Sequence, residues 1–464
     1  MQSIFQFKSR IPWWLSGVSL FIISQSFFQG QLYFEMIQSS GWSGMWFFWA
    51  GIQGSFIIPL LFAPLWQKLQ LPNDNHFYLK RFPGKGGQFL FHFRRIYVGF
   101  LVCSFLMALG LITYSNLLCN FTGLPLNATF VLVGIALMVM MWFNTLEFQV
   151  KWDFIIMVLY FILILSLIFW IIIPLKSNTT SVHWRDLFPH DTSGWNHWLF
   201  YLGFQWWATQ QMDGGSMETS RFTGVNQERE ARKSAVMAAM ASAIASVIIA
   251  ITAYLLVMNH ATSFWSGVLN LIPQNAQILV LLLLTGMMAA QILALSNWGA
   301  SLIVDNHQAN VKLSKVTVLI LVGFAMFIAL QNQSLIPLTQ YIFAISAGVA
   351  PFYILRWIFP KIGPWTQVLV MLISLVGTLL YPSIVGFDFV LFELQWEETR
   401  TLIIGSLTII AGLLSVIIFP SFQPTDAWIQ ILPSRSTWLR RLFIALIMGL
   451  LLLWFMTALI AAVL

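Results

Sequence analysis

Thirteen apolar runs, each long enough to cross a bilayer, follow one another along this chain with little polar sequence between them. The runs begin near Trp13, Gly44, Ile96, Ala128, Phe154, Trp198, Ala235, Ala276, Val316, Leu335, Thr366, Leu402 and Leu442. A transmembrane helix needs about 20 mostly apolar residues. Only 8% of the residues are charged, whereas a soluble domain carries roughly 25%. The sequence therefore predicts an all-α integral membrane protein with about 13 transmembrane helices, and residues 1–464 form a single membrane domain.

The distribution of basic residues sets the expected orientation. With the N-terminus placed in the cytoplasm and the helices alternating, 20 of the 23 Lys and Arg residues fall on the cytoplasmic side. The three exceptions are Lys176, Arg185 and Arg400. Cytoplasmic loops of membrane proteins collect Lys and Arg. We therefore predict a cytoplasmic N-terminus and an external C-terminus. Because the basic residues follow the predicted cytoplasmic loops, we expect the net charge of +7 to reflect a lipid bilayer as the partner and not nucleic acid.

Motifs for enzyme chemistry are missing from the sequence. It contains no phosphate-binding glycine loop, no nucleophile elbow and no zinc-binding helix signature. The two cysteines, Cys103 and Cys119, and the seven histidines do not cluster with metal-ligand spacing. We therefore expect neither an enzyme, a metal site nor an organic cofactor.

The first and sixth predicted helices are unusual because both contain polar residues and glycine at membrane depth. The first carries Ser24, Gln25, Ser26, Gln29, Gly30, Gln31 and Glu35, and the sixth carries Gln205, Gln210, Gln211, Asp213, Gly214 and Gly215. Polar side chains inside a membrane usually face a cavity or a partner helix. Two interrupted helices spaced five apart are typical of an inverted repeat with a binding site between its halves. Helix-to-helix packing by the Gln and Ser side chains is the alternative.

Several segments then resemble one transporter family in order along the chain. They are IPWWLSGVS (Ile11–Ser19), GWSGMWFFW (Gly41–Trp49), YLKRFPGK (Tyr78–Lys85), LGFQWWA (Leu202–Ala208), SNWGASLIVDN (Ser296–Asn306), QYIFAISAGVAPFYILRW (Gln340–Trp357) and PTDAWIQIL (Pro424–Leu432). The family is the sodium:solute symporters, in a divergent bacterial branch. The resemblance implies a leucine-transporter-type fold, with five-helix inverted repeats at roughly 11–174 and 197–358 and additional helices at 363–464. It also implies alternating access in the bacterial inner membrane.

The resemblance and the polar residues together predict a secondary transporter of a small neutral or zwitterionic organic solute. The residues predicted to bind the solute are Ser24, Gln29, Gln205, Trp206, Trp207, Gln210 and Gln340. Their amides and hydroxyls suit hydroxyl, amide or amine groups, and the two tryptophans match gate positions of the family. For the tryptophans, packing or anchoring at the lipid interface is the alternative. The second functional hypothesis is a degenerate transporter that acts as a membrane sensor or interaction protein.

The sequence departs from the family at its sodium site. Members of the family bind sodium with backbone carbonyls of the first helix and a Ser/Thr pair of the eighth, and this chain has Ala290 and Gln291 at the pair. A methyl group cannot coordinate sodium, and an amide brings two N–H donors. We therefore expect sodium coupling to be weak or absent, with Gln25 and Gln291 meeting at the former ion site in an amide–amide hydrogen bond. Alternatively, Gln291 only packs and the ion uses other oxygens.

Asp153 and Asp213 are candidates for a proton or ion pathway, and Glu35 is a further candidate proton carrier. Asp153, at the start of the fifth helix, matches an Asp that the family carries beside the cytoplasmic ion exit; pairing with Lys151 is the alternative. Asp213 lies beside the glycine pair of the sixth helix, where an ion pair with Arg221 is the alternative. If sodium does not drive transport, a proton is the other candidate for the coupling ion.

Overall fold

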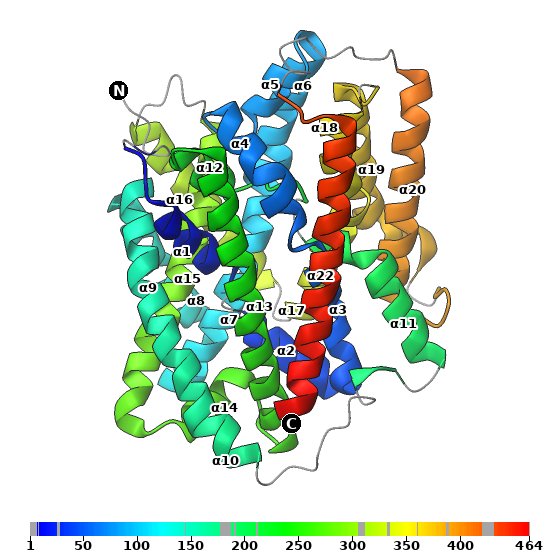
Figure 1. The fold of residues 1–464 in the computed structure, drawn as a ribbon. Helices are drawn as coiled ribbons and strands as arrows, with labels where there is room; N and C mark the ends of the chain where they lie inside the picture. The colour runs from blue at the N-terminus through cyan, green and yellow to red at the C-terminus, as the bar shows by residue number, and fades with distance from the viewer. Residues whose placement is uncertain are drawn as a thin grey trace.

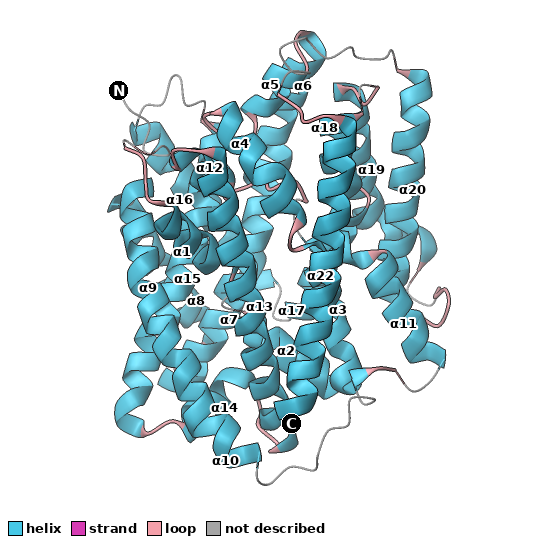
Figure 2. Ribbon diagram, in the orientation of Figure 1, coloured by secondary structure: helices cyan, strands magenta, loops and turns pink. Residues whose placement is uncertain are grey.

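The structure of the chain is a computed structural model. It describes residues 7, 9–25, 28–143, 145–176, 187–189, 192–209, 212–304, 311–331, 335–359, 361–386, 389–419 and 431–463. The described residues contain helices and loops but no strand (Figure 2). The predicted all-α architecture is therefore confirmed.

The helices of the first half of the chain include several segments of 3-10 and π-helix between α-helical stretches. They are α1 (Trp13–Ser24), α2 (Gln29–Ser40), η1 (Gly41–Met45), α3 (Trp46–Trp49), η2 (Ala50–Gly54), η3 (Ile58–Phe62), α4 (Ala63–Leu69), α5 (His76–Arg81), α6 (Lys85–Arg94), η4 (Arg95–Val102), α7 (Cys103–Thr122), α8 (Leu126–Phe143), α9 (Leu146–Leu167), η5 (Ile168–Ile172) and α10 (Ile173–Lys176).

The second half begins with short helices and continues with long ones. They are α11 (Thr192–Gly203), η7 (Gln205–Thr209), α12 (Thr219–Gly224), α13 (Glu228–Met258), α14 (Phe264–Leu271), α15 (Gln274–Ile303), α16 (Val311–Gln331), α17 (Leu335–Ala347), α18 (Ala350–Ile358), α19 (Pro364–Val385), α20 (Trp396–Ile418) and α22 (Arg435–Val463).

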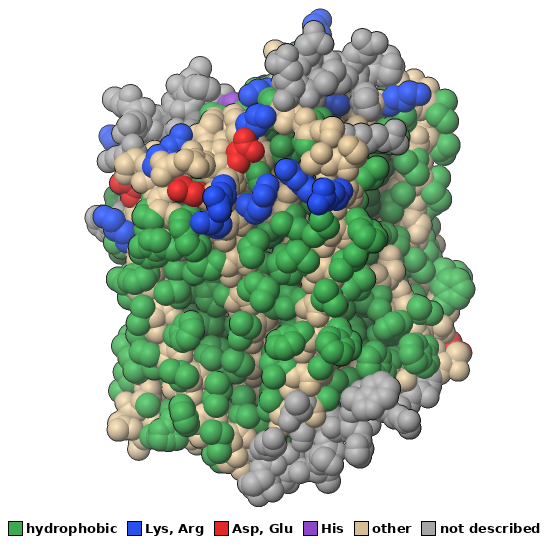
Figure 3. All heavy atoms as spheres, in the orientation of Figure 1, with side chains coloured by type: hydrophobic (Ala, Val, Ile, Leu, Met, Phe, Trp, Pro, Cys, Tyr) green, Lys and Arg blue, Asp and Glu red, His purple; other side chains and the backbone are tan. Residues whose placement is uncertain are grey.

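The long helices run roughly along one axis between two ends of the molecule. The N-terminal segment, α4, α5 and α6 lie at one end, and α10, α14 and the C-terminus lie at the other (Figure 1). Lys and Arg side chains gather near the first end on the face that Figure 3 shows. We call this end, which carries Lys68 and the start of α13, the basic end. The two termini thus lie at opposite ends, as the predicted odd number of crossings requires.

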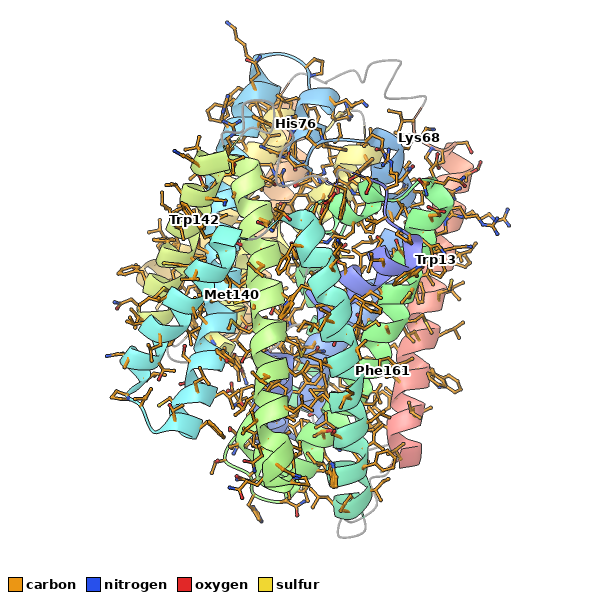
Figure 4. All side chains as sticks on the ribbon, turned by 90° about the vertical axis from the view of Figure 1, so that its left-hand side faces the viewer. Trp13, Lys68, His76, Met140, Trp142 and Phe161 are labelled. Carbon is orange, nitrogen blue, oxygen red and sulfur yellow. The ribbon has the colours of Figure 1, made fainter. Side chains whose placement is uncertain are left out.

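The outer surface between the two ends is apolar. Broad hydrophobic surface covers the middle of the molecule in Figure 3. Phe161 on α9 and Trp142 on α8 point outward (Figure 4), with 62% and 43% of their surface exposed. A soluble monomer rarely exposes continuous apolar surface on this scale, so lipid is the solvent of this belt.

Ten helices among the described residues are long and apolar enough to cross a membrane, and two shorter apolar helices, Trp13–Ser24 and Leu126–Trp142, accompany them. The chain is therefore an integral membrane protein. The count of thirteen crossings and the division into repeats stay predictions.

Both predicted interruptions are present. α1 ends at Ser24, Gln25 has an extended backbone (φ −79°, ψ 93°), and α2 begins only at Gln29. In the sixth predicted helix, η7 is separated from α12 by a turn in which Gly214 has a φ of +68°. A side chain is strained in that backbone conformation, so glycine is needed there.

Candidate functional site

A cavity of about 450 Å³ lies between the two interrupted helices. Its lining comes from α1, α2, α3, η2, η3, η4, α7, α12, α13, α15, α17 and α18, together with Ala208 and the residues 216–218. Small-molecule sites are typically concave and largely apolar, with volumes of roughly 300–1,000 Å³. This cavity therefore has the size and the position of a solute site.

One wall of the cavity is a row of hydrogen-bonded polar side chains. Ser24 and Ser242 share a hydrogen bond of 2.9 Å between their hydroxyls. The Gln29 amide nitrogen donates to the Tyr33 hydroxyl at 2.5 Å and to the Ser246 hydroxyl at 2.8 Å. The Gln29 side-chain oxygen accepts no hydrogen bond from the described residues, so it remains an acceptor that faces the cavity.

Ser24 and Gln29, both predicted to bind the solute, belong to this lining, whereas Gln205, Trp206, Trp207 and Gln340 do not. Gln205 donates to the Phe47 carbonyl and Trp207 to the Ala347 carbonyl, each at 3.0 Å. The structure buries Gln340 with 4% exposure.

Trp206 packs against Gly54, where an added Cβ would meet its ring at 2.9 Å. Gln210 lies outside the described residues. The role of each of these residues stays a prediction.

The predicted former sodium site borders the same cavity. Gln25 and Gln291 both line it and are buried, with 3% and 7% exposure. The Gln25 side-chain oxygen accepts from the Tyr160 hydroxyl at 3.3 Å, which links α1 to α9. Ala290 is fully buried. The amide–amide contact of Gln25 with Gln291 stays a prediction.

A buried polar network lies beside this junction. The Ser19 hydroxyl donates to Asp153 Oδ2 at 2.5 Å, and Arg221 Nε donates to the same hydroxyl at 3.1 Å. When the Gln149 amide is turned so that its oxygen faces the guanidinium, that oxygen accepts from Arg221 Nη2 at 2.9 Å. The alternative ion pair of Asp153 with Lys151 is wrong for the described residues. Asp153 instead connects α9 to α1.

A second buried network holds the basic end of the molecule together. Arg356 on α18 donates to Asp213 Oδ2 from Nε at 3.1 Å and from Nη2 at 2.5 Å. The Trp357 indole donates to the same oxygen at 2.6 Å, and the Trp66 indole donates to the Asp213 carbonyl at 2.5 Å. We call Asp213, Arg356, Trp357 and Trp66 the lock. The alternative pairing of Asp213 with Arg221 is wrong, because Arg356 is its partner.

The segment 73–94 extends the lock. Arg94 forms an ion pair of 2.9 Å with Asp74, and the Trp298 indole donates to the other oxygen of Asp74 at 2.8 Å. Arg81 Nε donates to the Arg356 carbonyl at 3.2 Å. Burial lowers the pKa of Arg81 to about 10, which leaves this cation charged at neutral pH. Trp298 also lines the cavity. Its hydrogen bond to Asp74 therefore connects the ion pair of Asp74 with Arg94 to the cavity wall.

A cluster of aromatic rings forms another part of the cavity wall. Phe48 lies against Tyr33 and Phe343, with ring centroids 5.7 and 6.2 Å apart, and all three residues line the cavity. Aromatic pairs at such distances pack favourably in edge-on or offset geometry. The cavity wall thus contains an aromatic layer as well as the link to the ionic contacts of the basic end.

Sequence reasoning missed several residues of the cavity and of the lock. They are Tyr33, Glu218, Ser242, Ser246, Thr339 and Arg356. Tyr160, which donates to Gln25, was missed as well. Ser242 and Ser246 are spaced four apart in the alanine-rich α13, so they share one helix face and could have been found from that pattern. The contact of Arg356 with Asp213 spans 143 positions, and no local pattern indicates it.

Comparisons with known proteins agree with this architecture. No known family's sequence profile matches the chain, and no curated protein matches it significantly in sequence. Among solved structures, a Na⁺-coupled sialic acid symporter in a substrate-bound outward-open state is similar, with a TM-score of 0.63 and 15% identity over 91% of this chain and 93% of that one. Mhp1, a nucleobase-cation-symport-1 family transporter in a closed conformation with bromovinylhydantoin bound, has a TM-score of 0.58 and 12% identity over 92% and 97%. At these identities the likeness concerns the fold, and the chain has the leucine-transporter-type fold.

Proposed function

We propose that this chain is a secondary transporter that moves a small organic solute by alternating access, as a divergent bacterial member of the sodium:solute symporter family. The observation that carries the proposal is the cavity of about 450 Å³ between the two interrupted helices. Interrupted helices that border a cavity at the middle of the membrane are the usual site of secondary transporters. The aromatic layer of its wall and the ionic contacts of the basic end are suited to act as the two gates.

The proposal includes weak or absent sodium coupling. In α15 no hydroxyl side chain occurs between Thr285 and Ser296. Sodium prefers oxygen ligands, and Ala290 offers none from its side chain. The Gln25 oxygen is already an acceptor for Tyr160.

Solute flux in proteoliposomes tests both parts of the proposal. We expect uptake of at least one member of a panel of amines, amino acids, sugars and nucleobases. Replacing an inward sodium gradient by an equal potassium gradient should leave that uptake unchanged. Ser242→Trp should abolish uptake, because the indole fills the cavity next to Ser24.

Ser166→Trp is the matched control, since Ser166 lies on α9 outside the cavity lining, and this variant should transport normally. Absence of flux for the whole panel would contradict transport and favour the sensor hypothesis. Uptake that requires sodium would contradict only the statement about coupling.

A further inference from the structure

Glu218 is the only charged side chain that lines the cavity in the described part of the chain. It immediately precedes α12 and lies beside the Gly214 turn, where an added Cβ would be 3.5 Å from the Glu218 Oε2 atom. The same Cβ would meet the Phe222 ring at 3.1 Å. The carboxylate and the aromatic ring therefore lie side by side at the cavity wall.

Among the described residues, the carboxylate of Glu218 accepts no hydrogen bond, and its charge interacts electrostatically with Arg221. The backbone N–H of Glu218 donates to the Ser216 hydroxyl at 3.2 Å, and neither carboxylate oxygen accepts a hydrogen bond. A charged group withdrawn from water without a partner costs several kcal/mol. Water or a bound cation that reaches the carboxylate would therefore stabilise it in addition to Arg221.

The nearby guanidinium of Arg221 is held by other groups. Its Nη1 atom donates to the Met217 carbonyl at 2.9 Å and to the Ser220 hydroxyl at 3.0 Å, and its Nε donates to Ser19. Arg221 also interacts electrostatically with both Asp153 and Glu218, so its charge is shared between two carboxylates. Arg221 is not part of the cavity lining.

The rest of the cavity offers good surroundings for a cation and poor ones for an anion. Phe222, Tyr97, Trp298 and Tyr353 contribute aromatic surface to the lining. Ring faces attract ammonium groups, and a carboxylate forms its strongest hydrogen bonds with charged donors. The described lining contains no Lys, Arg or His that would attract an acidic solute.

We propose that Glu218 binds an ammonium group of the solute, so that the cavity selects organic amines. The inference rests on the proposed transport function for its physiological meaning, but the binding of a cation at Glu218 can be tested without transport.

The first test measures the electrostatic field next to Glu218. Met217 lines the cavity, so Met217→Cys, in a Cys119→Ser background, provides a thiol beside the carboxylate. The remaining Cys103 is buried. We expect the cationic reagent aminoethyl methanethiosulfonate to react faster than the anionic sulfonatoethyl methanethiosulfonate. Glu218→Gln should lower the ratio of the two rates by about tenfold or more, given the Coulomb energy of a unit charge near a protein surface.

Glu228→Gln is the matched control, because Glu228 is an exposed carboxylate at the start of α13, and it should leave the ratio unchanged. A ratio that Glu218→Gln does not alter would overturn the proposal. Failure of both reagents to reach the thiol would also overturn it, since the cavity would then be closed to ligands.

The second test uses benzylamine and its neutral counterpart benzyl alcohol as probes on the purified full chain. Benzylamine should protect Met217→Cys from alkylation at concentrations at least about tenfold lower than benzyl alcohol, and Glu218→Gln should remove this difference. Equal protection by both probes in the parent protein would overturn the proposal.

The two proposals can fail separately. Flux restricted to neutral solutes and unaffected by Glu218→Gln would leave transport standing and overturn amine selection. In a further outcome, flux of a neutral solute depends on a pH gradient, and Glu218→Gln removes that dependence. This result would show that the carboxylate carries a proton, and it would overturn amine selection. A carboxylate-dependent preference for benzylamine without any flux would support the binding site and contradict transport.

Discussion

Asp153 is a carboxylate with one engaged and one free oxygen at the junction of the first, fifth and eighth predicted helices. Its side chain is fully buried, Oδ2 accepts from Ser19, and Oδ1 has no hydrogen-bond partner in the described part of the chain. The nearby Arg221 supplies the compensating charge. Asp153 therefore compensates the charge of the buried Arg221 guanidinium, whether or not it also belongs to an ion pathway.

We expect Asp153→Asn to destabilise the protein by about 3 kcal/mol, because it leaves the charge of Arg221 buried with less compensation. The measurement is thermal or denaturant unfolding of the purified protein in detergent. Lys151→Gln is the control, since Lys151 is an exposed residue on the same helix, and it should stay within about 0.5 kcal/mol of the parent. Equal stability of the two variants would show that Arg221 does not depend on Asp153.

The sequence identified polar residues that could line a site, but it did not show which groups each of them contacts. Ser24, Gln25 and Gln29 stand out because polar groups are rare at membrane depth, and all three line the cavity. Gln205 and Trp207 stand out equally, yet their side chains bond to backbone carbonyls of neighbouring helices. Sequence composition cannot separate a polar side chain that lines a cavity from one that bonds to a neighbouring backbone, because both provide a hydrogen-bonding partner for a polar group inside the membrane.

At the scale of elements, Arg356 of α18 makes several of the contacts that hold the basic end together. Arg356 joins that helix to the Gly214 turn through Asp213 and stacks on Phe77, with its guanidinium carbon 4.6 Å from the ring centroid. Opening of this end in an alternating-access cycle requires these contacts to separate. The ion pair is thus a candidate for a contact that is formed in one conformation and broken in the other. Solute binding would shift the equilibrium between these two conformations.

Asp213→Asn should loosen the lock and speed amide hydrogen exchange in α18 by about tenfold or more, because local opening no longer has to break an ion pair. Exchange followed by mass spectrometry on the purified protein would measure this. Glu228→Gln changes a carboxylate that lies outside the lock and should leave exchange in α18 as it is. Unchanged exchange in Asp213→Asn would mean that the indoles of Trp66 and Trp357 hold this end without the charge.

The positions of the two helix interruptions could be predicted from the sequence, but the residues that contact the interrupted segments could not. Glycine and polar residues inside the first and sixth apolar runs indicated breaks, and breaks occur at Gln25 and at Gly214. No sequence pattern indicated that Asp213 would pair with Arg356, because that contact depends on how two distant segments pack. A local pattern indicates where a helix ends, whereas its tertiary neighbours follow from the whole arrangement.

At the scale of the whole molecule, Lys and Arg side chains gather near one end on the face that Figure 3 shows, and the orientation in the membrane stays a prediction. The basic end carries the N-terminal segment and the opposite end carries the C-terminus (Figure 1). Of the three basic residues predicted outside, Arg400 is fully buried and stacks on Tyr341, with its guanidinium carbon 3.8 Å from the ring centroid.

An alkaline phosphatase fused to the C-terminus should be active in bacterial cells, and a green fluorescent protein fused there should be dark, because we expect the C-terminus outside. The same two reporters placed after Arg229, near the basic end, should give the reverse result, as the positive-inside rule requires. Fluorescence at both positions would contradict an odd number of crossings.

The single charge of the cavity has a consequence for the energetics of the proposed carrier. If an ammonium group neutralises Glu218, the loaded protein crosses its cycle as a neutral complex, and the empty protein returns with one negative charge. A carrier of this kind needs no sodium to work uphill. The membrane potential supplies about 2.3 kcal/mol per charge per 100 mV, which corresponds to roughly a 40-fold accumulation of the amine. Depolarising the membrane would then stop concentration of the solute but leave its exchange intact.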